Sequence, residues 1–132
     1  MKSAVVIGRS GQVGRGLVDY LSRSGFHVFA TSSKSGPNLL DLGNSSSINQ
    51  CLQSIRGELP KGQVRVFLAG ALTHVDLCEE KPDLCRQMNA LGPIRVAEIC
   101  KKFDWELSFY SSEYVFGAAE YRGEAAGPYS EE

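Results

Sequence analysis

Glycines recur every three residues near the start of the chain, in the stretch VVIGRSGQVGRG (residues 5–16). Gly8, Gly11 and Gly14 follow an apolar run and open a segment with helical periodicity. An apolar strand, a glycine turn and a helix in this order are typical of a cradle for the diphosphate of a dinucleotide. There the first glycine permits the sharp turn, the second lets the backbone approach the phosphates, and the third lets the helix pack on the strand. A tight turn that needs glycine only for its backbone freedom is the competing interpretation.

Two other glycine motifs do not fit this stretch. A P-loop requires Gly-Lys-Ser/Thr, which the chain lacks. The nucleophile elbow of hydrolases requires G-x-S-x-G, and GRSGQ does not match it.

The end of the second expected strand bears on the choice of dinucleotide. A carboxylate there would accept hydrogen bonds from the ribose 2′-hydroxyl of NAD, but the sequence reads Thr31-Ser32-Ser33-Lys34. Lys34 and Arg9 are suited to face a 2′-phosphate, so we expect NADP(H) to be favoured, with NAD(H) as the second choice. The alternative is that both side chains are solvated surface charges.

Strands and helices alternate along the chain. Strands are expected at residues 3–7, 26–31, 38–42 (a short one), 64–69 and 106–112, and helices from the glycines to residue 24, at 45–56 and at 82–102. This alternation predicts an α/β domain over residues 1–132, with a doubly wound, Rossmann-like parallel sheet of about five strands. Residues 117–132 are rich in Gly, Ala and Glu without periodicity, which predicts a loop or disordered tail.

The expected helix at 82–102 carries apolar residues on two faces. Leu84, Met88 and Leu91 share one face, whereas Cys85, Val96 and Cys100 lie roughly opposite. A helix that is apolar on two sides packs on two surfaces. The second surface suits a partner subunit, which suggests a homodimer through this helix, or a later part of the fold.

Composition excludes several classes of protein. The net charge is −1 and basic residues do not cluster, which argues against nucleic-acid binding. No apolar run approaches the roughly 20 residues of a membrane span, and no signal-peptide core is present, so we expect a soluble cytoplasmic protein. The four cysteines form no C-x-x-C pair. We expect them to be reduced core thiols rather than zinc ligands or disulfides, and no metal site is predicted.

Longer motifs follow the glycines: AGALTHVDLCEEKPDLCRQMNALGPIRVAEIC (69–100), SSEYVFG (111–117) and PYSEE (128–132). With the cradle, they make the chain resemble the extended short-chain dehydrogenase/reductase family, in particular dTDP-4-dehydrorhamnose reductases and the related β subunit of methionine adenosyltransferase. The resemblance implies the cofactor portion of an NAD(P)H-dependent reductase of a nucleotide-linked 4-keto sugar. A non-catalytic, dinucleotide-binding regulatory subunit and a sugar-nucleotide epimerase or dehydratase are the alternatives.

The resemblance and the glycine pattern together imply a set of cofactor-binding residues. They are Gly8, Arg9, Ser10, Gly11, Gln12, Val13 and Gly14 at the diphosphate, Ser32 and Lys34 after the second strand, Asp41 and Leu42 at the adenine, Ala69, Gly70 and Ala71 beside the riboses, and Asn89 near the active site. Simpler roles stay open for two of them. Asp41 would cap the following helix, and Asn89 would satisfy a buried carbonyl.

Two further residues match catalytic positions of the family. Ser112 corresponds to the catalytic Ser/Thr that hydrogen-bonds the substrate carbonyl, and Glu113 stands where the rhamnose reductases usually have Asp. Ser112 would otherwise merely end a strand. The family's proton donor is a Tyr four residues before a Lys, and no Tyr here has that partner. We expect that pair and the substrate lobe to lie beyond residue 132. His74 is expected to be a surface or rim residue.

Overall fold

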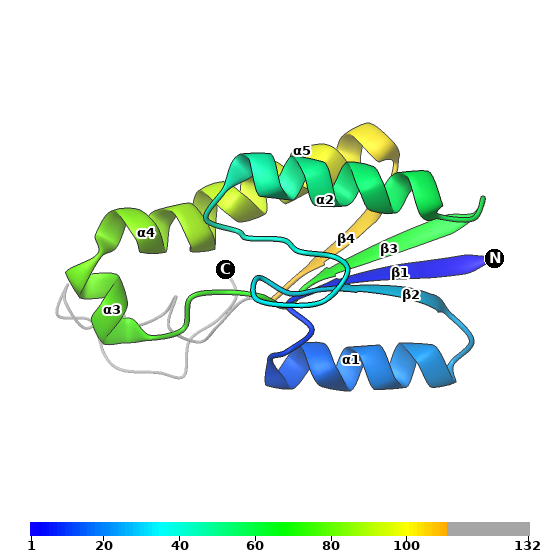
Figure 1. Cartoon of the computed structure of the whole chain (residues 1–132), viewed down its shortest axis with the longest axis horizontal. Coiled ribbons are helices and arrows are strands. Elements are labelled where there is room, and N and C mark those ends of the chain that lie inside the picture. The colour runs from blue at the N-terminus through cyan, green and yellow to red at the C-terminus, as the bar shows by residue number, and fades with distance from the viewer. Residues whose placement is uncertain (111–132) are drawn as a thin grey trace, which may run out of the picture.

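Four parallel strands form one sheet in residues 1–110, the part of the chain that this computed structural model describes. Their order is β2 (His27–Thr31), β1 (Lys2–Ile7), β3 (Gln63–Leu68), β4 (Glu106–Phe109), as Figure 1 shows. Residues 3–7 of β1 are all buried, because this strand lies inside the sheet and is covered on both faces.

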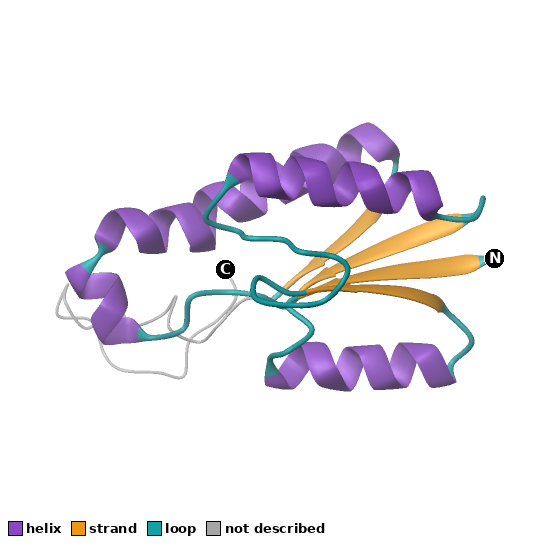
Figure 2. Ribbon diagram, viewed as in Figure 1, coloured by secondary structure: helices purple, strands orange, loops and turns teal. Residues whose placement is uncertain are grey.

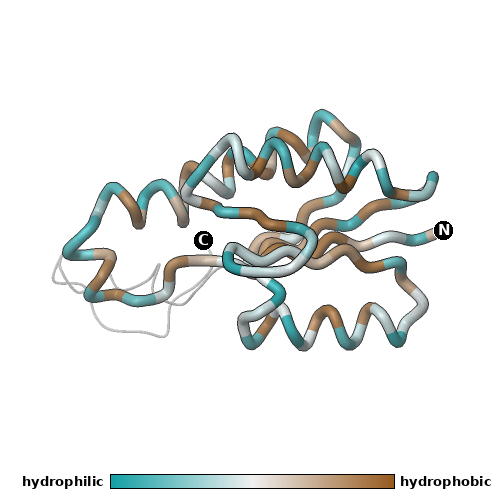
Figure 3. The backbone as a smooth tube through the Cα atoms, viewed as in Figure 1, coloured by the Kyte–Doolittle hydropathy of each residue, from teal (hydrophilic) through white to brown (hydrophobic). Residues whose placement is uncertain are grey.

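Helices cover both faces of the sheet (Figure 2). α1 (Gln12–Arg23) lies on one face, and α2 (Ser45–Glu58) and α5 (Gly92–Phe103) lie on the other. Successive residues of β1 therefore serve two separate cores. Val5 and Ile7 belong to the larger core under α2 and α5, whereas Val6 packs with Leu21 of α1. Figure 3 shows that the hydrophobic residues lie along the strands and on the helix turns that face the sheet. The α/β fold with a parallel sheet is confirmed.

The expected helix at 82–102 is confirmed in extent but is not regular. It consists of α4 (Pro82–Arg86), a π-helical turn η1 (Gln87–Leu91) and α5. Pro93 has no N–H group to donate to the carbonyl of residue 89, and the N–H of Gly92 bonds to the Gln87 carbonyl instead. The chain thereby gains a wide turn at Asn89. A short helix before it, α3 (Val75–Glu80), is not predicted by the sequence pattern.

The prediction of a short strand at 38–42 is wrong. Only an isolated bridge joins Ser32 and Leu39, so the described residues form four strands rather than five. Asp41 turns the chain instead, because its Oδ1 accepts a hydrogen bond of 2.8 Å from the Gly43 N–H. The cap of α2 is Asn44, whose Oδ1 accepts from the Ser46 and Ser47 N–H groups, so the capping role considered for Asp41 is also wrong.

The expectation of four reduced thiols is half right. Cys51 and Cys100 are free and buried in the larger core. Cys78 and Cys85 instead form a disulfide. The two helices α3 and α4 meet at a corner, and this brings the Cα atoms of the two cysteines to 5.0 Å.

The edge strand β4 ends at Phe109, three residues earlier than expected, and the expected tail at 117–132 lies outside the described residues. Among residues 1–110, no helix has the length and apolar character needed to cross a membrane.

Candidate cofactor-binding site

A cleft of about 530 Å³ opens at the carboxyl ends of β1 and β3. From β1 the chain continues to β2 on one side of the sheet, and from β2 it crosses over to β3 on the other. Open parallel sheets bind ligands at such a switch point, because the loops separate there and leave a crevice.

Two glycines of the motif are required by the protein's own packing. Gly8 has a φ of +92°, and a Cβ there would lie 2.7 Å from both Cα and N of Gly70 in the loop after β3. A Cβ on Gly14 would run into the carbonyl oxygen of Gly8. The turn after β1 is therefore squeezed between the loop after β3 and the first turn of α1.

Gly11 is different, because the described residues leave room for a side chain there. The nearest heavy atom to a Cβ on Gly11 would be the Gly8 carbonyl oxygen at 3.8 Å, an ordinary contact. Gly11, Gln12 and Val13 line the cleft, and Val13 is 52% exposed. The absence of a side chain at Gly11 therefore keeps the cleft open rather than relieving a clash.

The N-terminus of α1 also lacks what the N-terminus of α2 has. Within the described residues no side chain accepts a hydrogen bond from its first-turn N–H groups, and no acidic residue lies in that turn. In α2, Asn44 satisfies two such groups. The positive end of α1 thus presents N–H donors at the cleft, an arrangement that suits an anion such as a diphosphate.

Two cations lie close to the loop after β2. The guanidinium of Arg9 donates to the Ser35 carbonyl at 3.0 Å and to its Oγ at 3.3 Å. The side chain of Lys34 is exposed, and the backbone N–H of Lys34 donates to Oγ of the buried Ser32 at 3.2 Å. Ser32 therefore shapes this loop, while Arg9 and Lys34 supply positive charge beside it.

The structure brings most of the predicted cofactor residues together. Those that line the cleft are Gly8, Ser10, Gly11, Gln12, Val13, Leu42, Ala69, Gly70 and Ala71. The others, which do not line it, are Arg9, Gly14, Ser32, Lys34, Asp41 and Asn89. The predicted catalytic residues Ser112 and Glu113 lie outside the described residues.

Sequence reasoning missed five lining residues: Ile7, Ser33, Leu40, Thr73 and Met88. Ser33 and Thr73 lie in the loops that follow β2 and β3, so their positions after those strands were the available signal. Met88 reaches the cleft from η1, and no pattern in the sequence distinguishes this from a core position.

Asn89 stands one step behind the cleft wall. Its Nδ2 donates to the Leu72 carbonyl, and its Oδ1 accepts from the Leu72 N–H, both at 2.8 Å. Leu72 lies between Ala71 and Thr73, which line the cleft. Asn89 therefore holds this loop, consistent with the simpler role of satisfying a carbonyl, and its contact with a cofactor stays a prediction.

His74 is exposed at the start of α3, where its Nδ1 accepts from the Leu77 N–H at 3.1 Å. The expectation of a surface or rim residue is confirmed.

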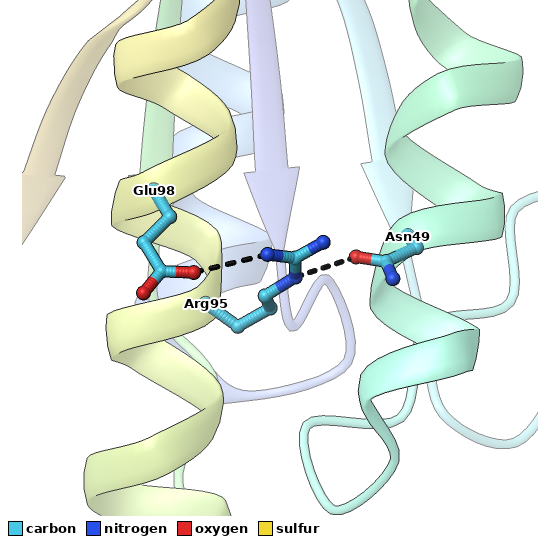
Figure 4. Close-up of polar contacts among 3 residues, drawn as sticks. All are labelled: Asn49, Arg95 and Glu98. Atoms are coloured by element: carbon cyan, nitrogen blue, oxygen red, sulfur yellow. Dashed lines mark hydrogen bonds and ion pairs between the residues drawn. The ribbon is translucent and has the colours of Figure 1, made fainter.

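A smaller hollow of about 210 Å³ lies between α2 and α5 and has a structural explanation. Figure 4 shows Arg95 of α5 between Asn49 of α2 and Glu98 of α5. Its Nε donates to Asn49 Oδ1 at 2.7 Å, and its Nη1 donates to Glu98 Oε2 at 3.0 Å. The bond to Asn49 joins the two helices, whereas the pair with Glu98 lies within α5.

Comparison with known proteins finds dTDP-4-dehydrorhamnose reductases with similar sequences and folds. A dTDP-4-dehydrorhamnose reductase of Mycolicibacterium smegmatis is 31% identical over 116 residues, which are 88% of this chain and 32% of that protein. The crystal structure of dTDP-4-dehydrorhamnose reductase from Bacillus anthracis in complex with NADP is 31% identical, with a TM-score of 0.71 over 87% of this chain and 38% of that one. A dTDP-4-dehydrorhamnose reductase from Clostridium acetobutylicum is 30% identical, with a TM-score of 0.77 over 99% of this chain and 41% of that one.

These matches confirm the resemblance to dTDP-4-dehydrorhamnose reductases. The chain spans between 32% and 41% of the length of these relatives. Over residues 1–132 it matches the family model described as the RmlD substrate binding domain, and it belongs to that family.

Proposed function

We propose that this chain is the cofactor-binding portion of an NAD(P)H-dependent reductase of a nucleotide-linked 4-keto sugar, and that it prefers NADP(H). The observation that carries the proposal is the uncapped N-terminus of α1 at a cleft that Gly11 keeps clear. The relative from Bacillus anthracis, which is 31% identical, is in complex with NADP and supports the same choice.

Each part of the cleft has a role in this proposal. The N–H groups at the start of α1 bind the diphosphate, and Arg9 and Lys34 bind the 2′-phosphate. The loop that Asn89 holds flanks the riboses. The cofactor, when bound, supplies a hydride to the ketone carbon of the sugar. Ser112 hydrogen-bonds the carbonyl oxygen and stabilises the charge that develops on it.

Calorimetric titration of the 132-residue chain with NADPH and NADH tests cofactor binding. We expect both to bind and NADPH to bind more tightly. The variant Gly11→Leu should lose binding, because its side chain would enter the cleft, while its free energy of unfolding falls by less than about 1 kcal/mol. Gly16→Leu is the matched control: Gly16 lies in α1, the helix that Gly11 caps, and a Cβ there meets no atom within 4 Å. Failure of both nucleotides to bind, or equal binding by Gly11→Leu and Gly16→Leu, would contradict the proposal.

We also propose that the chain self-associates through the helix at 82–102. Ile94 is 54% exposed and Leu91 is 42% exposed. Ile94 lies in an apolar groove of about 400 Å³ lined by Asn89, Ala90, Pro93, Ile94, Ala97, Leu107 and Phe109. Sedimentation velocity should detect a dimer that Ile94→Asp converts to monomer. Tyr20→Asp, at a 69% exposed position of α1 on the opposite face, should remain dimeric; a monomeric unmodified chain would refute self-association.

A further inference from the structure

The disulfide between Cys78 and Cys85 fixes a corner that short helices alone would not fix. α3 has six residues and α4 has five, and helices of this length are unstable without other contacts. The disulfide joins them across Lys81, the single residue between the two helices. Both cysteines are only partly buried, so small thiols and disulfides in solution reach them.

The two sulfur atoms lie next to Leu72 and Asn89, the two residues whose hydrogen bonds hold the cleft wall. Sγ of Cys78 lies 3.9 Å from the Leu72 carbonyl oxygen, and Sγ of Cys85 lies 3.5 Å from Nδ2 of Asn89. Asn89 in turn binds both backbone polar groups of Leu72. Leu72 is the direct neighbour of Ala71 and Thr73, which line the cleft.

We propose that Cys78 and Cys85 are a redox-sensitive pair whose disulfide holds the loop of residues 71–73 and thereby tightens cofactor binding. The proposal rests on the cofactor binding proposed above and adds its regulation. The disulfide acts by restricting the corner between α3 and α4 to the arrangement in which Asn89 binds Leu72.

The redox step is a thiol–disulfide exchange. A dithiol reductant attacks one sulfur through its thiolate, the S–S bond breaks, and the second reductant thiol releases the protein. The protein gains two electrons and two protons and becomes the dithiol, while the reductant becomes a cyclic disulfide. In reverse, oxidised glutathione takes the two electrons and two protons and leaves as two reduced glutathione molecules.

The other two cysteines do not compete in this exchange. Cys51 and Cys100 are buried in the larger core, and burial raises the pKa of each thiol to about 11. Since the thiolate is the reactive form, they stay inert near neutral pH.

Reduction is expected to weaken NADPH binding about five-fold. A free corner leaves the loop in its binding-competent arrangement for only part of the time, and the apparent Kd rises by the inverse of that fraction. The size of the effect corresponds to a competent fraction of about one in five.

The experiment compares the chain treated with oxidised glutathione and the chain treated with dithiothreitol, by titration with NADPH. Thiol titration after unfolding should find two free cysteines in the first sample and all four in the second. The double variant Cys78→Ser/Cys85→Ser should bind like the reduced chain and ignore both treatments. Cys51→Ala is the matched control, and it should keep the five-fold response.

Hydrogen exchange at the Leu72 amide gives a readout that needs no cofactor. We expect faster exchange in the reduced chain and in the double variant, because the Asn89 acceptor is then held less firmly. If neither form binds NADPH, the proposed function fails, and the Leu72 amide still decides whether the pair controls the loop. Equal exchange in both redox forms, equal NADPH affinity in both, or four free thiols after treatment with oxidised glutathione would each overturn the redox proposal.

Discussion

Gly11 is unlike the other two glycines of its motif because the protein leaves space for a side chain there. Gly8 and Gly14 satisfy close backbone contacts within the described fold, and substitution at either is opposed by the fold itself. Of the three motif glycines, Gly11 alone has room for a side chain among the described residues, so its role is not packing. At the residue scale, this difference turns a weak sequence motif into an argument for a ligand.

The preference for NADPH should depend on Arg9 and Lys34. Arg9→Ala and Lys34→Ala should each raise the Kd for NADPH about ten-fold and leave that for NADH nearly unchanged, because only NADPH has the 2′-phosphate. Calorimetric titration with both nucleotides measures the ratio. Lys61→Ala is the control, since Lys61 lies before β3, at the opposite end of the strands from the cleft. An equal loss of affinity for both nucleotides would show that these cations do not read the 2′-phosphate.

Thr31 offers a stability test at the same turn. It is fully buried, and within residues 1–110 its Oγ1 has no hydrogen-bond partner. Its backbone carbonyl accepts from the Arg9 N–H at 2.8 Å and does not depend on the side chain. Valine has the same shape, so Thr31→Val should leave the free energy of unfolding unchanged or raise it by about 1 kcal/mol. Chemical denaturation measures this, and a clear loss of stability would mean that the hydroxyl has a partner.

At the scale of elements, α2 and α5 are tied together where they flank the larger core. Arg95→Ala removes the bond to Asn49 and should lower the free energy of unfolding by about 1 kcal/mol, with nearly all of it from Asn49. The exposed pair with Glu98 adds little. Urea unfolding of Arg95→Ala, Asn49→Ala and the double variant should show strong coupling between the two positions. Additive effects would contradict it. Arg23→Ala breaks an ion pair whose Arg23 side chain is 80% exposed and should change almost nothing.

Most elements of the fold are predictable because their signals are local. The apolar runs of β1 and β3 and the Gly-x-x-Gly-x-x-Gly spacing locate the sheet and the cleft without tertiary information. Segment 38–42 misleads because Leu40 and Leu42 are buried, as in a strand, while Asp41 forms a turn. Its place is decided by tertiary contacts.

The cysteine pair shows the same limit in another form. Cys78 and Cys85 are seven residues apart, and only the corner between α3 and α4 brings them together. α3 itself has six residues and no buried one, so it leaves no periodic apolar signal. The loop held by Asn89, and the residues Thr73 and Met88 in the cleft, depend on this corner and on the π turn. Spacing in the sequence cannot locate such contacts.

At the scale of the whole molecule, the larger core contains two ionisable groups, and this makes global stability depend on pH. Burial raises the pKa of Cys51 and of Cys100 from 9.0 to about 11. Near neutral pH, well below 9, both thiols are protonated in the folded and the unfolded chain, and their full contribution is present. As the pH rises toward 11, the unfolded chain releases protons that the folded chain keeps, so the free energy of unfolding falls.

The loss should be on the order of 2 kcal/mol for each thiol, and urea unfolding across this pH range measures it. Lysines and tyrosines also titrate there, so the comparison that isolates the thiols is with Cys51→Ala and Cys100→Ala. Each variant is less stable at neutral pH, because it leaves a small cavity, but its stability should fall less steeply above pH 9. Parallel curves for the unmodified chain and both variants would show that these thiols ionise as readily in the core as in water, and the core would then be open to solvent at α2 and α5.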